Sequence, residues 1–348
     1  MLVYTPQSKT VLNSSKIYKG VNVLKILVTG VGGGAGQSVL KALRMAGFED
    51  VLAFDSSPLA AGFYFGYPGV VGFEALHPNY TDHLLKIAIE NQIDVIFPGH
   101  DIELKTLSKV VDLFHNNDIE ILVSDSRVID ICDDKLKTAQ FLESAGFDYP
   151  QTQTFHDFKW EGRPVVLKPQ FEGARSKDTY VAQDFEEFKR FSSFVNPQNC
   201  VVQEYIGGDE YTCGSIFMND TLLGVISMKR FLRNGDTYKA FSIKSEPINE
   251  FVGQVVTELK PFGACNVQLR IRDGKPYVFE INPRCSGTTA ARALVGFNEP
   301  SVILNYLKTK QYQEIHYEEA TILRYWQEVK VANSAILHSP YYEIQQTL

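Results

Sequence analysis

A polar β-hairpin near residue 270 carries the side chains of this chain that are best suited to chemistry. Residues 262–292 contain two alternating arms, 266–271 and 276–282, on either side of the turn sequence RDG. We expect a type I turn closed by a left-handed glycine, which pairs Ile271 with Lys275. Because side chains alternate between the two faces of a strand, the polar residues would share one face and the apolar residues would face a core.

The register of this hairpin decides which side chains meet. A three-residue loop places Gln268 opposite Val278 and Asn266 opposite Glu280. Four oxygen-bearing side chains then share the polar face, namely Asn266, Gln268, Glu280 and Asn282. A two-residue loop would move Gln268 to the face opposite Glu280 and destroy the site, because a slip of one residue inverts every side chain.

A face of amide and carboxylate oxygens with one formal charge suits a hard divalent cation. Mg²⁺ prefers oxygen ligands in near-octahedral geometry and keeps waters and substrate phosphates in its shell. Arg284 follows Asn282 by two residues, and its planar guanidinium suits phosphate oxygens. An ordinary half-exposed hairpin with polar residues facing water explains the pattern equally well. The residues alone therefore leave both interpretations open.

The string NVQLRIRDGKPYVFEINPRCSG resembles the metal-binding end of the ATP-grasp superfamily. It is most like the carbamoyl-phosphate synthase large chain and the amino-acid ligases related to the pyrrolysine-pathway ligase. The resemblance implies that Gln268, Glu280 and Asn282 hold two Mg²⁺ ions on the phosphates of ATP. Mn²⁺ is an alternative metal. It also implies that Arg284 acts in catalysis by steadying the transferred phosphoryl group.

The resemblance implies an α/β fold class, with an α+β catalytic part. A Rossmann-like N-terminal domain would precede an ATP-grasp domain that holds the nucleotide between two antiparallel-sheet subdomains. In such a domain the D-K dipeptide supplies Lys135 to the phosphates. Lys168 ends the apolar run PVVL, where a buried stem can deliver an ammonium to phosphate oxygens in binding and catalysis.

Two further segments resemble nucleotide-binding parts of the family. The loop QFEGARSKD is similar to the phosphate-covering loop, with fewer glycines than usual, and its candidate contacts are Glu172, Gly173, Arg175, Ser176 and Lys177. The segment 200–217 is similar to the adenine hinge, in which the backbone of Tyr205 and Ile206 reads the adenine edge beside Glu204. Glu210 follows the glycine turn, and its carboxylate suits the ribose hydroxyls. A plain hairpin turn with exposed acids is the alternative.

Two groups of residues are candidates for the substrate side. Cations gather between residues 229 and 244, beginning with Lys229 and Arg230, and could hold an anionic acceptor or the transferring phosphate. Lysines at strand edges also discourage strand pairing, which explains the same pattern. After the hairpin, backbone N–H groups at a helix start can bind an anion. That second group consists of Ser286, Gly287 and Arg292.

The N-terminal part alternates strands with helices, which predicts a parallel sheet covered on both faces. Its glycine turn at 30–37 and Asp55 at the end of the second strand fit a dinucleotide fingerprint, so an NAD(P)-dependent oxidoreductase is the competing hypothesis. In the ATP-grasp interpretation this domain binds no dinucleotide and helps to seat the acceptor substrate. Ligands collect beyond strand carboxyl ends, where the candidates are Gly32, Gly33, Asp55, His100, Asp101 and Glu103.

Composition fits a soluble metabolic enzyme. The 348 residues suggest an arm at 1–22, a Rossmann-like domain at 23–125, an ATP-grasp domain at 126–310 and a covering segment at 311–348. A net charge of −7 argues against a general nucleic-acid or membrane partner. Five scattered cysteines indicate reduced thiols. We see no signal peptide and no apolar run of about 18 residues, and we therefore expect a cytoplasmic protein. A homodimer is the expected oligomeric state, because it is the commonest one.

These observations predict an ATP-dependent carboxylate–amine ligase. It would form an amide or peptide-type bond from two small molecules through an acylphosphate and release ADP and phosphate. One alternative is the carboxyphosphate or carbamate kinase chemistry of carbamoyl-phosphate synthases, although a single ATP-grasp unit argues against a complete synthase. The oxidoreductase and a non-catalytic nucleotide-binding module are the others. The sequence identifies neither the acid nor the amine.

Overall fold

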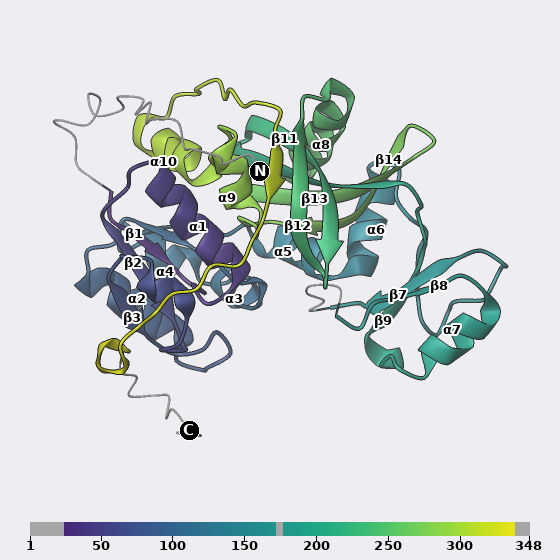
Figure 1. Cartoon of the computed structure of the whole chain (residues 1–348), viewed down its shortest axis with the longest axis horizontal. Coiled ribbons are helices and arrows are strands. Elements are labelled where there is room, and N and C mark those ends of the chain that lie inside the picture. Colours follow the sequence, from purple (N-terminus) through teal and green to yellow (C-terminus); the bar gives the residue numbers. More distant parts are fainter. Residues whose placement is uncertain (1–23, 172–176, 338–348) are drawn as a thin grey trace, which may run out of the picture.

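The computed structural model describes residues 24–171 and 177–337, whose strands form three sheets (Figure 1). The expected N-terminal arm lies outside the described residues. So do four of the five candidate contacts in the phosphate-covering loop, namely Glu172, Gly173, Arg175 and Ser176.

The first sheet is parallel and has the strand order β3-β2-β1-β4-β5. Its strands are β1 Ile26–Val28, β2 Val51–Asp55, β3 Gly69–Val71, β4 Val95–Phe97 and β5 Glu120–Ile121. Its helices are α1 Gly34–Met45, η1 Ala61–Tyr64, α2 Tyr80–Glu90, α3 Asp101–Leu107 and α4 Val111–His115. Every residue of β1 and β4 is buried, as a parallel strand covered on both faces requires.

Helix α1 packs closely against the carboxyl end of β1. A Cβ at Gly36 would lie 2.4 Å from the carbonyl oxygen of Gly30, so only glycine fits there. The glycine turn is therefore explained by helix–strand packing, one of the roles that glycines have in Rossmann-like turns.

The second sheet is small and carries its own core. Helices α5 Ser126–Asp133 and α6 Lys135–Ser144 lead into it, and its strand order is β6-β9-β7-β8. The elements are β6 Thr152–Thr154, β7 Val165–Pro169, β8 Tyr180–Ala182, α7 Phe185–Ser192, η2 Pro197–Asn199 and β9 Cys200–Glu204. This subdomain projects from the rest of the molecule in Figure 1.

The third sheet is larger and has the order β14-β13-β10-β11-β12-β15. Its strands are β10 Asp209–Met218, β11 Thr221–Arg233, β12 Asp236–Ile243, β13 Gly263–Arg272, β14 Lys275–Asn282 and β15 Thr321–Leu323. Helices α8 Glu246–Leu259, α9 Thr289–Leu294 and α10 Glu299–Thr309 complete it. The parallel N-terminal sheet and the two antiparallel sheets confirm the expected fold class.

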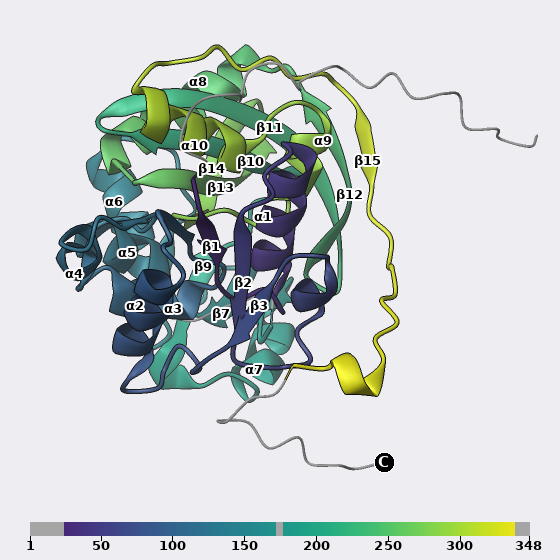
Figure 2. The same cartoon turned by 90° about the vertical axis from the view of Figure 1, so that its left-hand side faces the viewer.

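The C-terminal segment follows the outside of the molecule. Strand β15 pairs with β12, and the chain then runs along the N-terminal domain to η3 Asn333–Ala335 (Figure 2). Leu337 packs against the core beneath Gly69. Within the described residues, no helix has both the length and the apolarity to cross a membrane.

The hairpin of β13 and β14 differs from the expected register at its tip. Arg272 pairs with Lys275, so the loop is the two-residue turn Asp273-Gly274. Both turn residues have left-handed backbones, with φ of 53° and 75°. Such a turn matches strand twist and favours Asp-Gly, and the expected three-residue loop is therefore wrong.

A β-bulge returns the polar side chains to one face. Leu269 pairs with Val278, whereas Gln268 pairs with Glu280, so Phe279 is an extra residue in β14. The expectation that a two-residue loop would separate Gln268 from Glu280 is therefore also wrong. The shorter turn shifts the pairing of β14 with β13 by one residue, and the bulge shifts it by one more, so Gln268 and Glu280 again lie on the same face.

Candidate active site

A cleft of about 310 Å³ lies between the two antiparallel sheets. Strands β7 and β9 line one side, and β10, β11, β13 and β14 line the other. Its described lining includes Lys135, Lys168, Tyr205, Glu210 and Glu280. The sheets therefore bring together candidates that lie far apart in the sequence.

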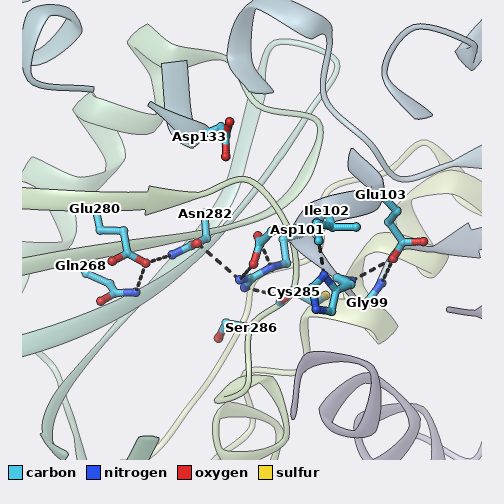
Figure 3. A network of polar contacts seen from close by, with 12 residues as sticks. Gly99, Asp101, Ile102, Glu103, Asp133, Gln268, Glu280, Asn282, Cys285 and Ser286 are labelled. Carbon is cyan, nitrogen blue, oxygen red and sulfur yellow. Dashed lines mark hydrogen bonds and ion pairs between the residues drawn. The ribbon is translucent and has the colours of Figure 1, made fainter. Parts of the chain in front are cut away.

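The three expected metal ligands meet at one carboxylate (Figure 3). Glu280 Oε1 accepts hydrogen bonds from Gln268 Nε2 at 3.0 Å and from Asn282 Nδ2 at 2.9 Å. A 180° rotation of each amide exchanges its nitrogen and oxygen without moving the backbone, and gives up the contacts of the oxygens with Arg230 and Arg284. With both amides rotated, three oxygen-bearing groups would converge, which is the donor set that Mg²⁺ prefers. These residues therefore fit a magnesium ion.

The described part of the chain contains no group of three His, Cys, Asp or Glu side chains placed to hold a metal. The Gln268–Glu280–Asn282 cluster is a different kind of group, because only one of its three side chains is a carboxylate. Its low formal charge leaves the phosphates of a nucleotide to supply most of the negative charge around the ion.

Arg284 extends the same line of contacts toward the N-terminal domain. Its guanidinium donates to Asp101 through Nε at 2.8 Å and Nη2 at 2.6 Å, and to Asn282 Oδ1 at 3.4 Å. Burial raises the pKa of Asp101, but the Arg284 guanidinium outweighs it and leaves that pKa below its ordinary value. The pair is therefore ionised near neutral pH.

The two expected phosphate-binding lysines are buried. Lys168 Nζ donates to Gln203 Oε1 at 2.9 Å and to the Phe279 carbonyl at 3.2 Å. Burial lowers the pKa of Lys168 to about 8; Glu280 opposes this shift and Lys135 adds to it. Two ammonium groups held at one end of a cleft suit a polyanion.

The expected adenine hinge lies at the end of β9. The Ile206 carbonyl accepts a hydrogen bond from Arg270 at 3.3 Å, and Glu204 binds Arg272 at 2.7 Å. Sequence reasoning missed both arginines. The period-two spacing of Gln268, Arg270 and Arg272 was a usable signal, because it places all three on one face.

Glu210 is held by two arginines. Arg230 Nε donates to it at 2.8 Å and Arg270 Nη2 at 2.6 Å, while Arg230 also donates to Gln268 Oε1. A ribose would therefore meet a carboxylate whose two oxygens each already accept a hydrogen bond from an arginine. Arg230 lines the cleft, whereas the described lining does not include Lys229, which pairs with Asp209 at 2.7 Å.

The expected substrate role of Arg292 requires a correction. Its side chain is fully buried and binds Glu299 at 2.6 Å, so a substrate cannot reach it. It also donates to the Ser286 hydroxyl at 2.9 Å, and Ser286 is itself buried. The Gly287 carbonyl accepts from Ser38 of α1 at 2.9 Å. These residues join the two domains at this point and offer no free anion site.

Two candidates of the N-terminal domain are also internal supports. Glu103 is buried and accepts hydrogen bonds from Thr29, Gly99 and His100. Asp55 accepts the backbone N–H groups of Gly32 at 2.7 Å and Ser57 at 2.9 Å. The carboxylate that the dinucleotide hypothesis requires for a ribose is therefore already used within the turn.

This combination of a parallel-sheet domain, two antiparallel sheets and a Gln–Glu–Asn cluster agrees with the comparisons. Residues 132–288 match the family model described as the ATP-grasp domain, and residues 26–122 match the PylC-like N-terminal domain. The chain therefore contains an ATP-grasp domain preceded by a PylC-like N-terminal domain, as the resemblance led us to expect.

The chain matches only part of the length of each similar curated protein. The carbamoyl phosphate synthase large chain of Caldanaerobacter subterraneus subsp. tengcongensis is 24% identical over 49% of this chain and 18% of its own length. The carbamoyl-phosphate synthase of Methanobrevibacter smithii is 29% identical over 38% of each.

Two solved structures share the fold over most of both chains. An N5-carboxyaminoimidazole ribonucleotide synthetase in complex with ADP has a TM-score of 0.69 at 14% identity, covering 86% of this chain and 81% of its own. The L-amino acid ligase from Bacillus licheniformis has a TM-score of 0.64 at 17% identity, covering 82% and 74% respectively.

Proposed function

We propose that this protein is an ATP-dependent carboxylate–amine ligase that forms an amide or peptide-type bond through an acylphosphate. The observation that carries the proposal is the meeting of Gln268, Glu280 and Asn282 beside a cleft that also contains Lys168. This arrangement concentrates cation-binding groups and a buried ammonium where a triphosphate would lie between the two sheets.

The chemistry follows from charge. A substrate carboxylate oxygen attacks the γ-phosphorus, the bond to the bridging oxygen breaks, and ADP leaves. The amine nitrogen then attacks the acyl carbon, loses a proton and expels phosphate. Lys135, Lys168 and Arg284 offset the negative charge on the phosphoryl group in the first step. Mg²⁺, when bound, would neutralise phosphate oxygens, and we propose two ions, with Mn²⁺ as an alternative.

Substrate-dependent ADP release tests this proposal. A panel of amino acids, short peptides and other acids and amines is scored for ADP and phosphate, with mass spectrometry of the product. We expect Glu280→Ala to abolish the substrate-dependent release, because the shared carboxylate of the cluster is lost. Glu258→Ala, an exposed acid on α8, is the matched control. Turnover of Glu280→Ala at the wild-type rate would refute the metal assignment.

A second candidate within the family is carboxyphosphate or carbamate kinase chemistry, which the curated relatives favour by their names. The two candidates differ in their requirement for an amine. Bicarbonate alone should stimulate ADP release if the second candidate holds, whereas the ligase requires an organic acid for the first step and an amine for the product.

The oxidoreductase hypothesis has less support, since Asp55 is bound within its own turn. Thermal shift with MgATP and with NAD(P)H separates the hypotheses, because only a ligand that binds the folded state raises the melting temperature. ATP binding without turnover across the whole panel would favour a non-catalytic module. A cytoplasmic location, small-molecule carboxylate and amine partners and a homodimer remain part of the proposal.

A further inference from the structure

Two groups of polar contacts lie between the core of the N-terminal sheet and the Gln268–Glu280–Asn282 cluster (Figure 3), and the peptide bond between His100 and Asp101 joins them. The first group begins at Glu103, which is buried and receives the Thr29 hydroxyl at 2.6 Å and the Tyr80 hydroxyl. The same carboxylate accepts the backbone N–H groups of Gly99 and His100, both at 2.9 Å. The loop that follows β4 is therefore fixed to the sheet.

Asp101 stands directly after this fixed loop, at the first position of α3. On its other side, His100 Nδ1 accepts the Ile102 N–H at 3.2 Å and completes a capping box with Glu103. Side chains thus hold the backbone on both sides of Asp101, and this fixes the position of its Cα and the direction of its carboxylate.

From that position Asp101 binds Arg284 through two parallel hydrogen bonds of 2.8 and 2.6 Å. The other acceptors of this guanidinium are neutral, namely the Cys285 carbonyl at 3.1 Å and Asn282 Oδ1 at 3.4 Å. Within the described ranges, Asp101 is the one carboxylate in hydrogen-bond contact with Arg284. A bidentate pair fixes both the direction and the plane of a guanidinium.

The charge of Arg284 matters for the neighbouring cation site. In the structure Arg284 donates to Asn282 Oδ1 at 3.4 Å, and Nδ2 of the same amide faces Glu280. The amide oxygen faces a metal at Glu280 only after a rotation that gives up this contact, so Arg284 acts on the metal through its charge. Without Asp101, an unpaired guanidinium would lie beside the cation site, where its charge would repel a metal ion and its side chain could rotate.

Resting on the ligase function proposed above, we infer that Asp101 is a positioning residue. It holds Arg284 for phosphoryl transfer and neutralises the guanidinium charge that would otherwise repel a metal at Glu280. A side chain of the N-terminal domain thereby completes the site of the ATP-grasp domain. The described lining of the nucleotide cleft includes neither Asp101 nor Arg284, so nucleotide affinity and turnover should respond differently to their loss.

The kinetic test compares Asp101→Asn, which keeps the shape and removes the charge, with the wild type. We expect kcat for substrate-dependent ADP release to fall about tenfold or more, the size of effect seen when a group that supports a metal site without binding the metal is removed. The KM for MgATP should change less than twofold. Asp101→Glu should recover part of the loss, because it restores the charge at a slightly different reach.

Asp220→Asn is the matched control. Asp220 forms an exposed ion pair with Lys260 at 3.0 Å, and its backbone has a φ of 58°, which asparagine tolerates. Its kcat should equal that of the wild type. If Asp101→Asn keeps the wild-type kcat, the inference is wrong.

A double-mutant cycle separates positioning from a general structural role. If Asp101 acts through Arg284, the double variant Asp101→Asn/Arg284→Ala should lose no more activity than Arg284→Ala alone, within about twofold. Two independent roles would instead multiply the two losses. Multiplied losses would overturn the inference.

Metal binding provides a readout that does not depend on turnover. Titration of Mn²⁺ in the presence of ADP, followed by electron paramagnetic resonance of the free ion, should show about tenfold weaker binding for Asp101→Asn. Wild-type affinity in that variant would contradict the inference. If the wild type binds Mn²⁺ with ADP but no acid and amine release ADP, the proposed ligase function fails while the positioning role stands.

Discussion

Buried charge is the feature of individual residues that best explains this site. Lys168 is 8% exposed, and its neighbours in the structure are two carbonyl oxygens from Gln203 and Phe279. Burial lowers the pKa of its ammonium to about 8, against an ordinary value of 10.5. A phosphate placed in the cleft would restore the charge that burial makes costly.

We predict that nucleotide affinity falls as pH rises through about 8. Below that pKa the ammonium of Lys168 is present in the free protein; above it, binding must first take up a proton. The dissociation constant for MgADP should therefore rise by up to about tenfold per pH unit above 8. Isothermal titration calorimetry between pH 7 and about 9.5 checks this, and Lys168→Arg, always charged, should show a flat profile. A flat wild-type profile would contradict the prediction.

The role of Arg292 could not be predicted from its place in the sequence. Its position after Ser286 suggested a substrate contact, yet the side chain is fully buried against Glu299. A Cβ at Gly214 would lie 2.4 Å from Arg292 Nε, so a distant glycine makes room for it. The sequence shows neither this glycine nor the Arg292–Glu299 pair, because both depend on strands that meet only in the folded chain.

We expect Arg292→Met to lower the free energy of unfolding by about 3–5 kcal/mol, because it leaves the Glu299 charge buried without a partner. Arg292→Met/Glu299→Gln should recover much of that loss by removing the stranded charge. Urea denaturation of both variants measures the difference. A double variant no more stable than the single one would show that the charge is not the cause.

The β13–β14 hairpin is the element on which the site depends. Alternation placed Gln268 and Glu280 on one face, and the structure agrees, although the bulge at Phe279 interrupts the alternation of β14 between Val278 and Glu280. The expected register was wrong at the tip and the polar face was still right, because the shorter turn and the bulge at Phe279 each change the register by one residue and together restore the shared face. The Asp-Gly pair was a usable signal for the shorter turn, whereas nothing in the sequence marks the bulge.

Deletion of Phe279 should keep Gln268 and Glu280 together while the protein still folds. In the shortened strand Glu280 directly follows Val278, the partner of Leu269, and therefore still lies opposite Gln268. We expect Mn²⁺ binding in the presence of ADP to stay well within the roughly tenfold loss that follows when a metal site loses a supporting group, with a cooperative thermal transition retained. Binding weakened by more than that would show that the shape of the bulge itself, and not the shared face, makes the site.

In the whole molecule, one of the hydrophobic cores is shared across the expected domain boundary at residue 125. This core contains Val28 and Leu40 of the N-terminal domain together with Ile226 and Ile303 of the third sheet and α10. A second core, which includes Leu27, lies almost entirely within the expected N-terminal domain. The small sheet has a separate core that includes Leu167, so the subdomain over the nucleotide cleft is a packing unit of its own.

Hydrogen exchange should therefore reveal two cooperative units rather than two sequence domains. Val28→Ala leaves a cavity in the shared core and should increase exchange in both the N-terminal sheet and β10–β13, because these elements open together. Leu167→Ala should increase exchange only in the small subdomain. MgADP should slow exchange there in the wild type, since a ligand between the sheets holds that subdomain closed. If Val28→Ala affects the N-terminal sheet alone, the shared core does not couple the two domains, and Asp101 would then reach Arg284 from a unit that opens independently.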